Sequence, residues 1–228
     1  MVNPKFIKVC RIRFPEIKLK TRDAHKLRGF FGEIFKEHSP LLHNHYNNGS
    51  FRYRYPLVQY KVIKEVPMLV GLEEGANLLT ELFLKIKELV LDGTLYQINR
   101  KNIEISNDPV GYSDSLHSYR FESLWMGLNQ ENFKVYNKMD DSIEKQRFLT
   151  KILVGNILGF FSNVGIKLHP KEKLMANIDL SEKTTRFKDK TMLAFEGRFI
   201  VNAYLPEYLG IGKSVSRGFG TIIKTREN

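Results

Sequence analysis

The 228-residue sequence has a single cysteine, Cys10. One cysteine excludes an internal disulfide. It also leaves too few cysteine ligands for a typical structural zinc site. The first twenty residues carry too many charges, and too short an apolar run, for a signal peptide or a membrane span. The chain also has no low-complexity segment. These absences predict a cytoplasmic globular protein that is stabilised by an ordinary hydrophobic core, with no membrane partner.

Acidic residues are scarce relative to basic ones. The 36 lysines and arginines exceed the 25 aspartates and glutamates, which gives a formal net charge of +11. Basic side chains release condensed counterions when they meet phosphates, so this excess favours a polyanionic partner, nucleic acid above all. Composition alone leaves open a basic protein that has no such partner.

The first half of the chain reads as β-α-β-β-α-β. Period-two and helical apolar patterns predict strands at 5–14, 51–63, 66–72 and 94–105, and helices at 21–38 and 73–91. This is the element order of a ferredoxin-like domain. Within it, the pattern of the first strand places Cys10 in the buried interior.

The second half repeats the order incompletely. Strands are predicted at 117–128, 173–180, 191–205 and 220–226, and one long helix at 141–165. A glycine-rich loop stands where the second helix is expected. Turn-forming residues at 107–111 mark the seam, which gives domains at 1–107 and 108–228. The predicted fold class is therefore α+β: two tandem ferredoxin-like (RRM-like) domains, with antiparallel sheets and helices on one face.

The glycine-rich loop, "GIGKSVSRGFG" at 210–220, fails two nucleotide-binding motifs. A Walker A loop needs glycine at Glu207, and a dinucleotide fingerprint needs it at Val215. What remains is a basic turn in which glycines permit positive φ and let backbone amides face an anion. The candidate RNA-binding residues here are Gly210, Gly212, Lys213, Ser214, Ser216, Arg217, Gly218 and Gly220. The alternative is a hairpin loop without a ligand.

Two histidines, His43 and His45, lie in a polar segment after the first predicted helix, ahead of a tyrosine-rich strand that includes Tyr53. A metal site lacks ligands here. Histidine exchanges protons near neutral pH, and RNA cleavage by its own 2′-hydroxyl needs a base, an acid and a stabilising cation. General acid–base catalysis on RNA without a metal is therefore the chemistry that this segment favours. A surface histidine without a role is the alternative.

The strand that follows the histidines, "FRYRYPLVQYK", alternates two kinds of side chain. Arg52 and Arg54 fall on one face, where they can meet phosphate, and aromatic residues fall on the other. The aromatic residues could stack on bases, but aromatic side chains of a strand are more often packed in a core, so core packing is favoured.

The double β-α-β-β-α-β order with "GIGKSVSRGFGTI" before the last strand resembles the repeat-associated RNA-binding proteins of CRISPR systems. Within that superfamily, "LLHNH" followed by "YRYPLVQYK" is similar to a segment of the CRISPR repeat endoribonucleases. The resemblance covers essentially the whole chain. It implies tandem ferredoxin-like domains and metal-independent cleavage of precursor CRISPR RNA that leaves a 2′,3′-cyclic phosphate and a 5′-hydroxyl.

The resemblance also implies site residues. It places the catalytic histidine at His43 or His45, with His45 favoured, and makes Tyr53 a candidate to position the 2′-hydroxyl or the leaving group. Lys61 is the nearest candidate for the lysine that the family often adds. It implies no cofactor and no metal. The expected partners are CRISPR repeat RNA and other CRISPR-associated proteins, with the chain a monomer or a homodimer.

Two other functions stay open from the sequence. One is a non-catalytic RNA-binding subunit of a CRISPR ribonucleoprotein, which would share the fold and the glycine-rich loop. The other is a nucleotide or small-anion binding domain, against which the failed Walker and dinucleotide matches count.

Overall fold

A computed structural model describes residues 4–34, 55–187 and 190–225. Their contacts divide the chain into two compact units. The N-terminal unit comprises residues 6–108 together with 215–218. The C-terminal unit comprises residues 109–214 and 219–225, together with Pro4 and Lys5.

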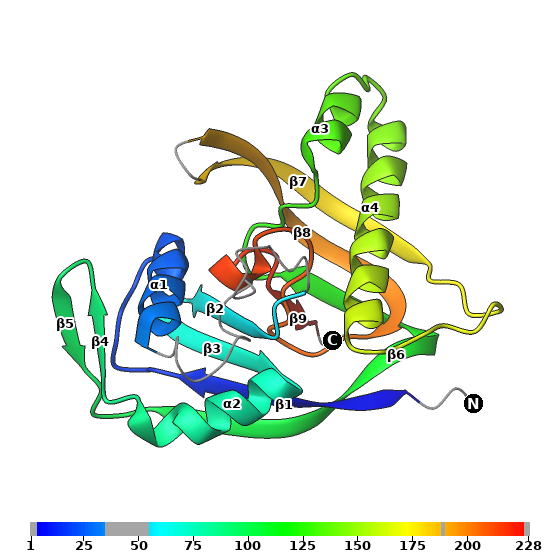
Figure 1. The fold of residues 1–228 in the computed structure, drawn as a ribbon. Coiled ribbons are helices and arrows are strands. Elements are labelled where there is room, and N and C mark those ends of the chain that lie inside the picture. Colours follow the sequence, from blue (N-terminus) through cyan, green and yellow to red (C-terminus); the bar gives the residue numbers. More distant parts are fainter. Residues whose placement is uncertain (1–3, 35–54, 188–189, 226–228) are drawn as a thin grey trace, which may run out of the picture. The chain divides into compact units, whose positions relative to one another are not determined.

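The N-terminal unit contains the predicted β-α-β-β-α-β order with an added hairpin (Figure 1). Its elements are β1 (Lys5–Arg13), α1 (Ala24–Ile34), β2 (Val58–Ile63), β3 (Val66–Leu72), α2 (Glu74–Leu82), β4 (Glu88–Leu91), β5 (Thr94–Gln97) and the start of β6 (Asn102–Phe121). Short 3₁₀ turns, η1 (Thr21–Asp23) and η3 (Phe83–Lys85), precede α1 and follow α2. The sheet order is β2-β3-β1-β6, and β3 pairs antiparallel with both β2 and β1.

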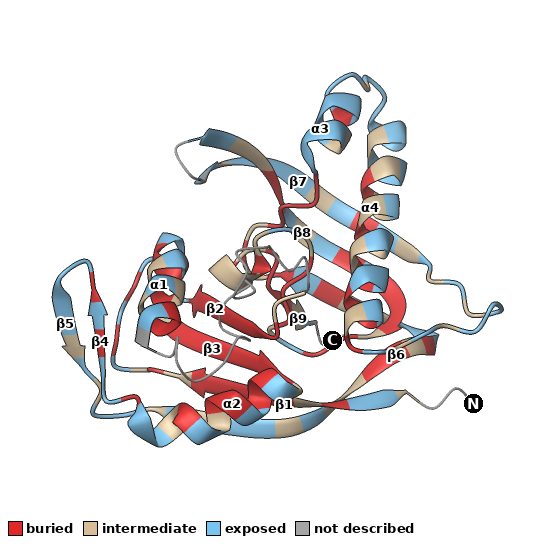
Figure 2. Ribbon diagram, in the orientation of Figure 1, coloured by how far each residue is buried: buried red, intermediate tan, exposed pale blue. Residues whose placement is uncertain are grey.

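The core of this unit lies on one face of the sheet, where both helices pack. Leu27 and Phe31 of α1 and Leu79 of α2 join Cys10 and Tyr60 of the strands in one buried cluster. Figure 2 shows that β2 and β3 are buried along almost their whole length, whereas β1 is exposed at its N-terminal end and mostly buried beyond it. The expected placement of the helices on one face, and the burial of Cys10, are confirmed.

The second predicted helix, 73–91, is wrong in its second half. Helix α2 ends at Leu82, and Glu88–Leu91 forms β4, paired antiparallel with β5. Asp92 and Gly93 connect the two strands with positive φ values of 50° and 77°. Two residues with positive φ form the tight turn of a β-hairpin. Residues 88–91 therefore pair with β5 as a strand, although their apolar spacing also fits a helix.

The C-terminal unit contains the rest of β6, α3 (Gln130–Tyr136), α4 (Ser142–Asn163), β7 (Ala176–Phe187), β8 (Lys190–Tyr204) and β9 (Ile222–Lys224). Antiparallel β8 lies between β7 and β6, and β9 also pairs with β6. The long helix and the absence of an α-helix between β8 and β9 agree with the prediction, since residues 205–221 contain only the 3₁₀ turn η4 (Val215–Arg217). The short helix α3 was not predicted.

The turn-forming residues at 107–111 lie inside β6 and form no turn. The polar residue Asp108 serves instead as a partner for the buried guanidinium of Arg11, which also bonds Ser106 at 2.9 Å and Glu104 at 3.1 Å. A buried arginine needs such partners, so Asp108 compensates a buried charge here and does not form a turn.

Candidate nucleic-acid interface

The middle of the glycine-rich loop, Val215–Gly218, packs on α1 and β2 in the N-terminal unit. Gly218 has a φ of 88°, and a Cβ built on it would lie 2.8 Å from the Cβ of Ala24 and 3.3 Å from the carbonyl oxygen of Tyr60. Its amide donates to the Val215 carbonyl at 3.2 Å. Glycine is required at this position both by the backbone conformation and by the lack of space.

This packing brings Arg217 near Arg28 of α1. Both side chains are half-buried, and burial together with the positive charge of Arg28 lowers the pKa of Arg217. Among residues 4–34, 55–187 and 190–225, no carboxylate forms an ion pair with Arg28 within 4.0 Å. An arginine without an acidic partner is suited to bind a phosphate, and within the described part of the chain Arg28 is such a residue.

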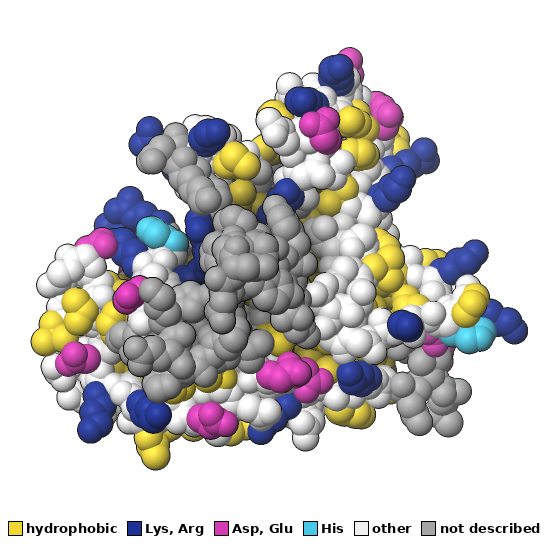
Figure 3. Space-filling view, viewed as in Figure 1, with side chains coloured by type: hydrophobic (Ala, Val, Ile, Leu, Met, Phe, Trp, Pro, Cys, Tyr) yellow, Lys and Arg dark blue, Asp and Glu magenta, His cyan; other side chains and the backbone are white. Residues whose placement is uncertain are grey.

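The exposed face of α1 extends this basic surface. His25 is exposed, and its Nδ1 lies 2.6 Å from the carbonyl oxygen of Arg22. Lys26, by contrast, is engaged by Asp23 at 2.8 Å and Asp92 at 2.6 Å. Figure 3 shows Lys and Arg side chains gathered over α1. Arg28 was not among the predicted site residues, although the spacing of Arg22, His25 and Arg28 by three residues could have indicated one helical face.

Lys61, expected among the RNA-contacting residues, lies below this surface. It is 0% exposed on β2, and burial lowers its pKa to about 7. A Cβ built on Gly218 would lie 3.7 Å from the Cα of Lys61. Because its side chain is fully buried, Lys61 does not contact a phosphate at the surface in this structure.

The two ends of the loop belong to the C-terminal unit, and there too the glycines serve packing. A Cβ on Gly212, whose φ is 95°, would lie 2.6 Å from Nε1 of the buried Trp125. A Cβ on Gly220 would overlap the carbonyl oxygen of Ile211. Gly210 is buried and bridges to Thr221.

The backbone amides of the loop are largely used within the protein. The amide of Lys213 donates to Met126 and that of Gly220 to Leu124, both at 2.9 Å, in addition to the Gly218 amide described above. The expectation that successive amides face an anion is therefore wrong for these three positions. The side chains remain available: Lys213 is exposed, while Ser214 and Ser216 are half-buried.

Five other predicted site residues, His43, His45, Arg52, Tyr53 and Arg54, lie outside the described residues. Within the described part of the chain, no group of three or more His, Cys, Asp or Glu side chains could hold a metal ion. In the same part, no helix is long and apolar enough to cross a membrane.

Comparison with known proteins first defines the class. Tandem ferredoxin-like folds of CRISPR-associated proteins match nearly the whole chain; one example, "Csf5, CRISPR-Cas type IV Cas6 crRNA endonuclease", has a TM-score of 0.63 at 12% identity over 97% of this chain and 100% of its own. At that identity the likeness concerns the fold.

Family models then define the family. The model of the Cas6b N-terminal domain matches residues 5–108, and that of the Cas6b C-terminal domain matches residues 111–225. The chain belongs to the Cas6b family.

Three relatives illustrate this membership. A solved Cas6b structure is 36% identical with a TM-score of 0.91, and a structure named CRISPR RNA processing endoribonuclease Cas6b is 32% identical with a TM-score of 0.78. Each alignment covers 96% of this chain and 100% of the relative. An uncharacterised protein of Methanocaldococcus jannaschii is 34% identical over 148 residues, which are 64% of this chain and 99% of the relative.

Proposed function

We propose that this protein is a metal-independent endoribonuclease that cleaves precursor CRISPR RNA within its repeats. The 2′-hydroxyl on the 5′ side of the scissile bond loses its proton and attacks the adjacent phosphorus. The bond to the 5′-oxygen breaks, and that oxygen takes up a proton. The products are a 2′,3′-cyclic phosphate and a 5′-hydroxyl, so atoms and charges balance without a metal or an added reactant.

The observation that carries this proposal is the match of both halves of the chain to Cas6b domains, together with 32% identity to a protein named as a CRISPR RNA processing endoribonuclease. The net charge of +11 and the paired arginines at the loop support RNA as the substrate.

The proposed roles draw on both predicted domains, 1–107 and 108–228. His45, or His43, is the general base or acid, and Tyr53 orients the reacting groups. Lys213 and Arg217 hold the RNA backbone, with Ser214, Ser216, Arg52 and Arg54 as further contacts. We add Arg28 to this set because it lies beside Arg217. The loop glycines shape the loop, and the buried Lys61 belongs to strand β2, on which the loop packs.

Incubation of the purified protein with its cognate repeat RNA tests the reaction. We expect cleavage at one site, unchanged in the presence of EDTA, and no product when the nucleotide on the 5′ side of the cut carries 2′-deoxyribose. Loss of cleavage in EDTA would overturn the metal-free mechanism. Tight binding without cleavage would instead identify a non-catalytic RNA-binding subunit.

A further inference from the structure

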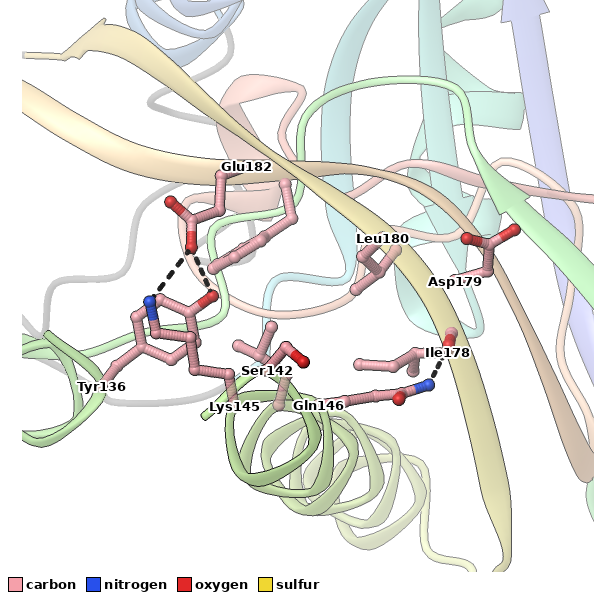
Figure 4. Close-up of a pocket in the computed structure, with 10 residues that line it drawn as sticks. Tyr136, Ser142, Lys145, Gln146, Ile178, Asp179, Leu180 and Glu182 are labelled. Atoms are coloured by element: carbon pink, nitrogen blue, oxygen red, sulfur yellow. Dashed lines mark hydrogen bonds and ion pairs between the residues drawn. The ribbon is translucent and has the colours of Figure 1, made fainter. Parts of the chain in front are cut away.

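A pocket of about 330 Å³ lies within the C-terminal unit, between the first turns of α4 and the side of β7 that faces this helix (Figure 4). Leu149, Ile178 and Phe195, all buried, contribute its apolar lining. Glu182 of β7 and Lys145 of α4 contribute charges of opposite sign. A pocket that combines apolar side chains with convergent polar groups can hold a small molecule or a base.

Glu182 is held in place by Tyr136 of α3. The buried hydroxyl of Tyr136 donates to Oε1 of Glu182 at 2.7 Å. Burial raises the pKa of Tyr136, and the hydrogen bond to Glu182 and its charge raise it further, so the hydroxyl remains a donor at neutral pH. The Glu182 side chain is about half exposed, at 52%, so its carboxylate is oriented by the protein and open to a ligand.

Lys145 lies beside the same carboxylate without bonding it closely. Its Nζ is 4.0 Å from Oε1 of Glu182 and 5.2 Å from the ring centre of Tyr136. Figure 4 shows these three side chains converging from β7, α4 and α3. Among the residues that the structure describes, neither the Lys145 ammonium nor Oε2 of Glu182 has a hydrogen-bond partner.

Two neighbouring polar side chains, Gln146 and Asp179, already have partners. The amide nitrogen of Gln146 donates to the carbonyl oxygen of Ile178 at 2.8 Å, and the carboxylate of Asp179 accepts from Arg198 at 2.9 Å. Hydrogen-bonding capacity remains at Lys145 and Glu182, where a fixed acceptor adjoins a cationic donor, and at the hydroxyl of Ser142 on the first turn of α4.

This pairing matches one nucleobase better than the other three. Guanine presents a carbonyl oxygen, O6, next to two adjacent N–H donors, N1 and N2. A carboxylate can accept both donors at once, and a lysine can donate to O6. Adenine, cytosine and uracil each lack the pair of adjacent donors. The apolar side chains of the lining can contact the face of a planar ring.

We propose that this pocket binds a guanine base, with Glu182 accepting from N1–H and N2–H and Lys145 donating to O6. The base can come from an RNA strand or from a free nucleotide. Use of the pocket by repeat RNA rests on the proposed function, whereas the recognition of guanine does not.

Titration calorimetry with GMP, IMP, AMP, CMP and UMP tests the recognition without any cleavage. We expect GMP to bind most tightly, and IMP, which lacks the N2 amine, to bind about tenfold more weakly because one hydrogen bond to a charged group is lost. Binding of GMP no tighter than that of AMP, or no binding of GMP at millimolar concentration, would overturn the proposal.

Variants assign the binding to the pocket. Glu182→Gln can still accept from Tyr136 but cannot accept two donors as a carboxylate does, so we expect GMP affinity to fall at least tenfold. Lys145→Met should weaken GMP several-fold. Lys151→Met removes the same charge from an exposed position of α4 and should leave the preference for GMP over IMP unchanged. Equal GMP affinity in wild type and Glu182→Gln, with unaltered melting temperatures, would contradict the site.

Repeat RNA with inosine at single guanine positions separates the two sources of the base. If RNA supplies it, one inosine should weaken binding to the wild-type protein and have no effect on Glu182→Gln. If GMP binds selectively and no inosine matters, the ligand is a free guanine nucleotide. Cleavage of unmodified RNA is measured in parallel, so failure of the pocket and failure of the proposed nuclease remain distinguishable.

Discussion

The two units use closely packed glycines for different ends. In the N-terminal unit, a Cβ on Gly71 would lie 2.8 Å from the amide nitrogen of Ala76, so glycine lets helix α2 sit directly on strand β3. In the C-terminal unit, Gly212 and Gly220 seat a loop where an α-helix is expected, against Trp125 and Ile211. Close packing at glycine thus holds a helix against the sheet in the N-terminal unit. In the C-terminal unit it holds the basic loop that takes the place of the second helix.

The largest expected effect is loss of RNA cleavage on replacing the histidines of the first half, in contrast to loss of RNA binding on replacing a lysine of the second half. A His43→Ala/His45→Ala variant should lose cleavage by about 10²–10⁴-fold because it lacks the proton-transfer group, and it should bind repeat RNA as wild type does. Lys213→Ala should instead weaken RNA binding and keep the single-turnover rate at saturating enzyme. Undiminished cleavage by the double histidine variant would remove the catalytic assignment.

Replacing glycine by alanine should change the free energy of unfolding in opposite directions at a closely packed position and at an open one. Gly220→Ala introduces a Cβ that overlaps the Ile211 carbonyl at a φ of 63°, so we expect the free energy of unfolding to fall by about 2–4 kcal/mol in urea denaturation. Gly29→Ala is the control: nothing lies within 4 Å of its Cβ position on helix α1, and alanine should stabilise the protein by up to about 1 kcal/mol. Equal stabilities of the two variants would contradict this difference.

Lys61 should make the stability of the N-terminal unit depend on pH. Its pKa is lowered from 10.5 to about 7 in the folded state, so between these values the unfolded chain binds the extra proton. The free energy of unfolding should therefore rise with pH from about 7 to 10.5, by at most about 1.4 kcal/mol per pH unit.

Lys61→Met should remove this rise, as measured by urea denaturation at several pH values. Lys18→Met, at an exposed position, should keep it. A wild-type curve that is flat over this window would show that Lys61 is charged in the folded protein.

The smallest effect concerns the arginine pair. Arg28→Ala and Arg217→Ala should each reduce the slope of log K against log salt concentration for single-stranded repeat RNA by about 0.7, since each removes one phosphate contact. Arg198→Ala removes an equal charge in the C-terminal unit, where Asp179 pairs with it, and should leave the slope unchanged. A slope unaffected by both α1 and loop variants would place the RNA elsewhere.

Periodicity predicted the regular elements well. The strand predicted at 66–72 is β3, and the helix predicted at 141–165 is α4 to within two residues at its C-terminal end. These segments succeed because each buries one face against a single core, so the apolar spacing alone specifies them. The helix at 73–91 failed in its second half because the left-handed Asp92–Gly93 pair closes a hairpin on residues that also fit a helical pattern.

The candidate site was predicted in part. The glycine density and the cations of the loop marked the segment, but not the task of each residue. The amides of Lys213, Gly218 and Gly220 are used by backbone carbonyls, two of which lie about ninety residues away in the sequence. Arg217, which lies near Arg28, and Tyr136, which bonds Glu182, are likewise distant along the chain from these residues. No local sequence pattern could therefore reveal either pairing.

Composition and local spacing are enough to specify the charge, the order of most strands and helices, and the place of the glycine-rich loop. The burial of Lys61, the nearness of Arg217 to Arg28, and the convergence of Tyr136, Lys145 and Glu182 on one pocket arise only in the folded chain. Such properties depend on which distant segments pack together, and burial and neighbouring charge then set what each side chain can do.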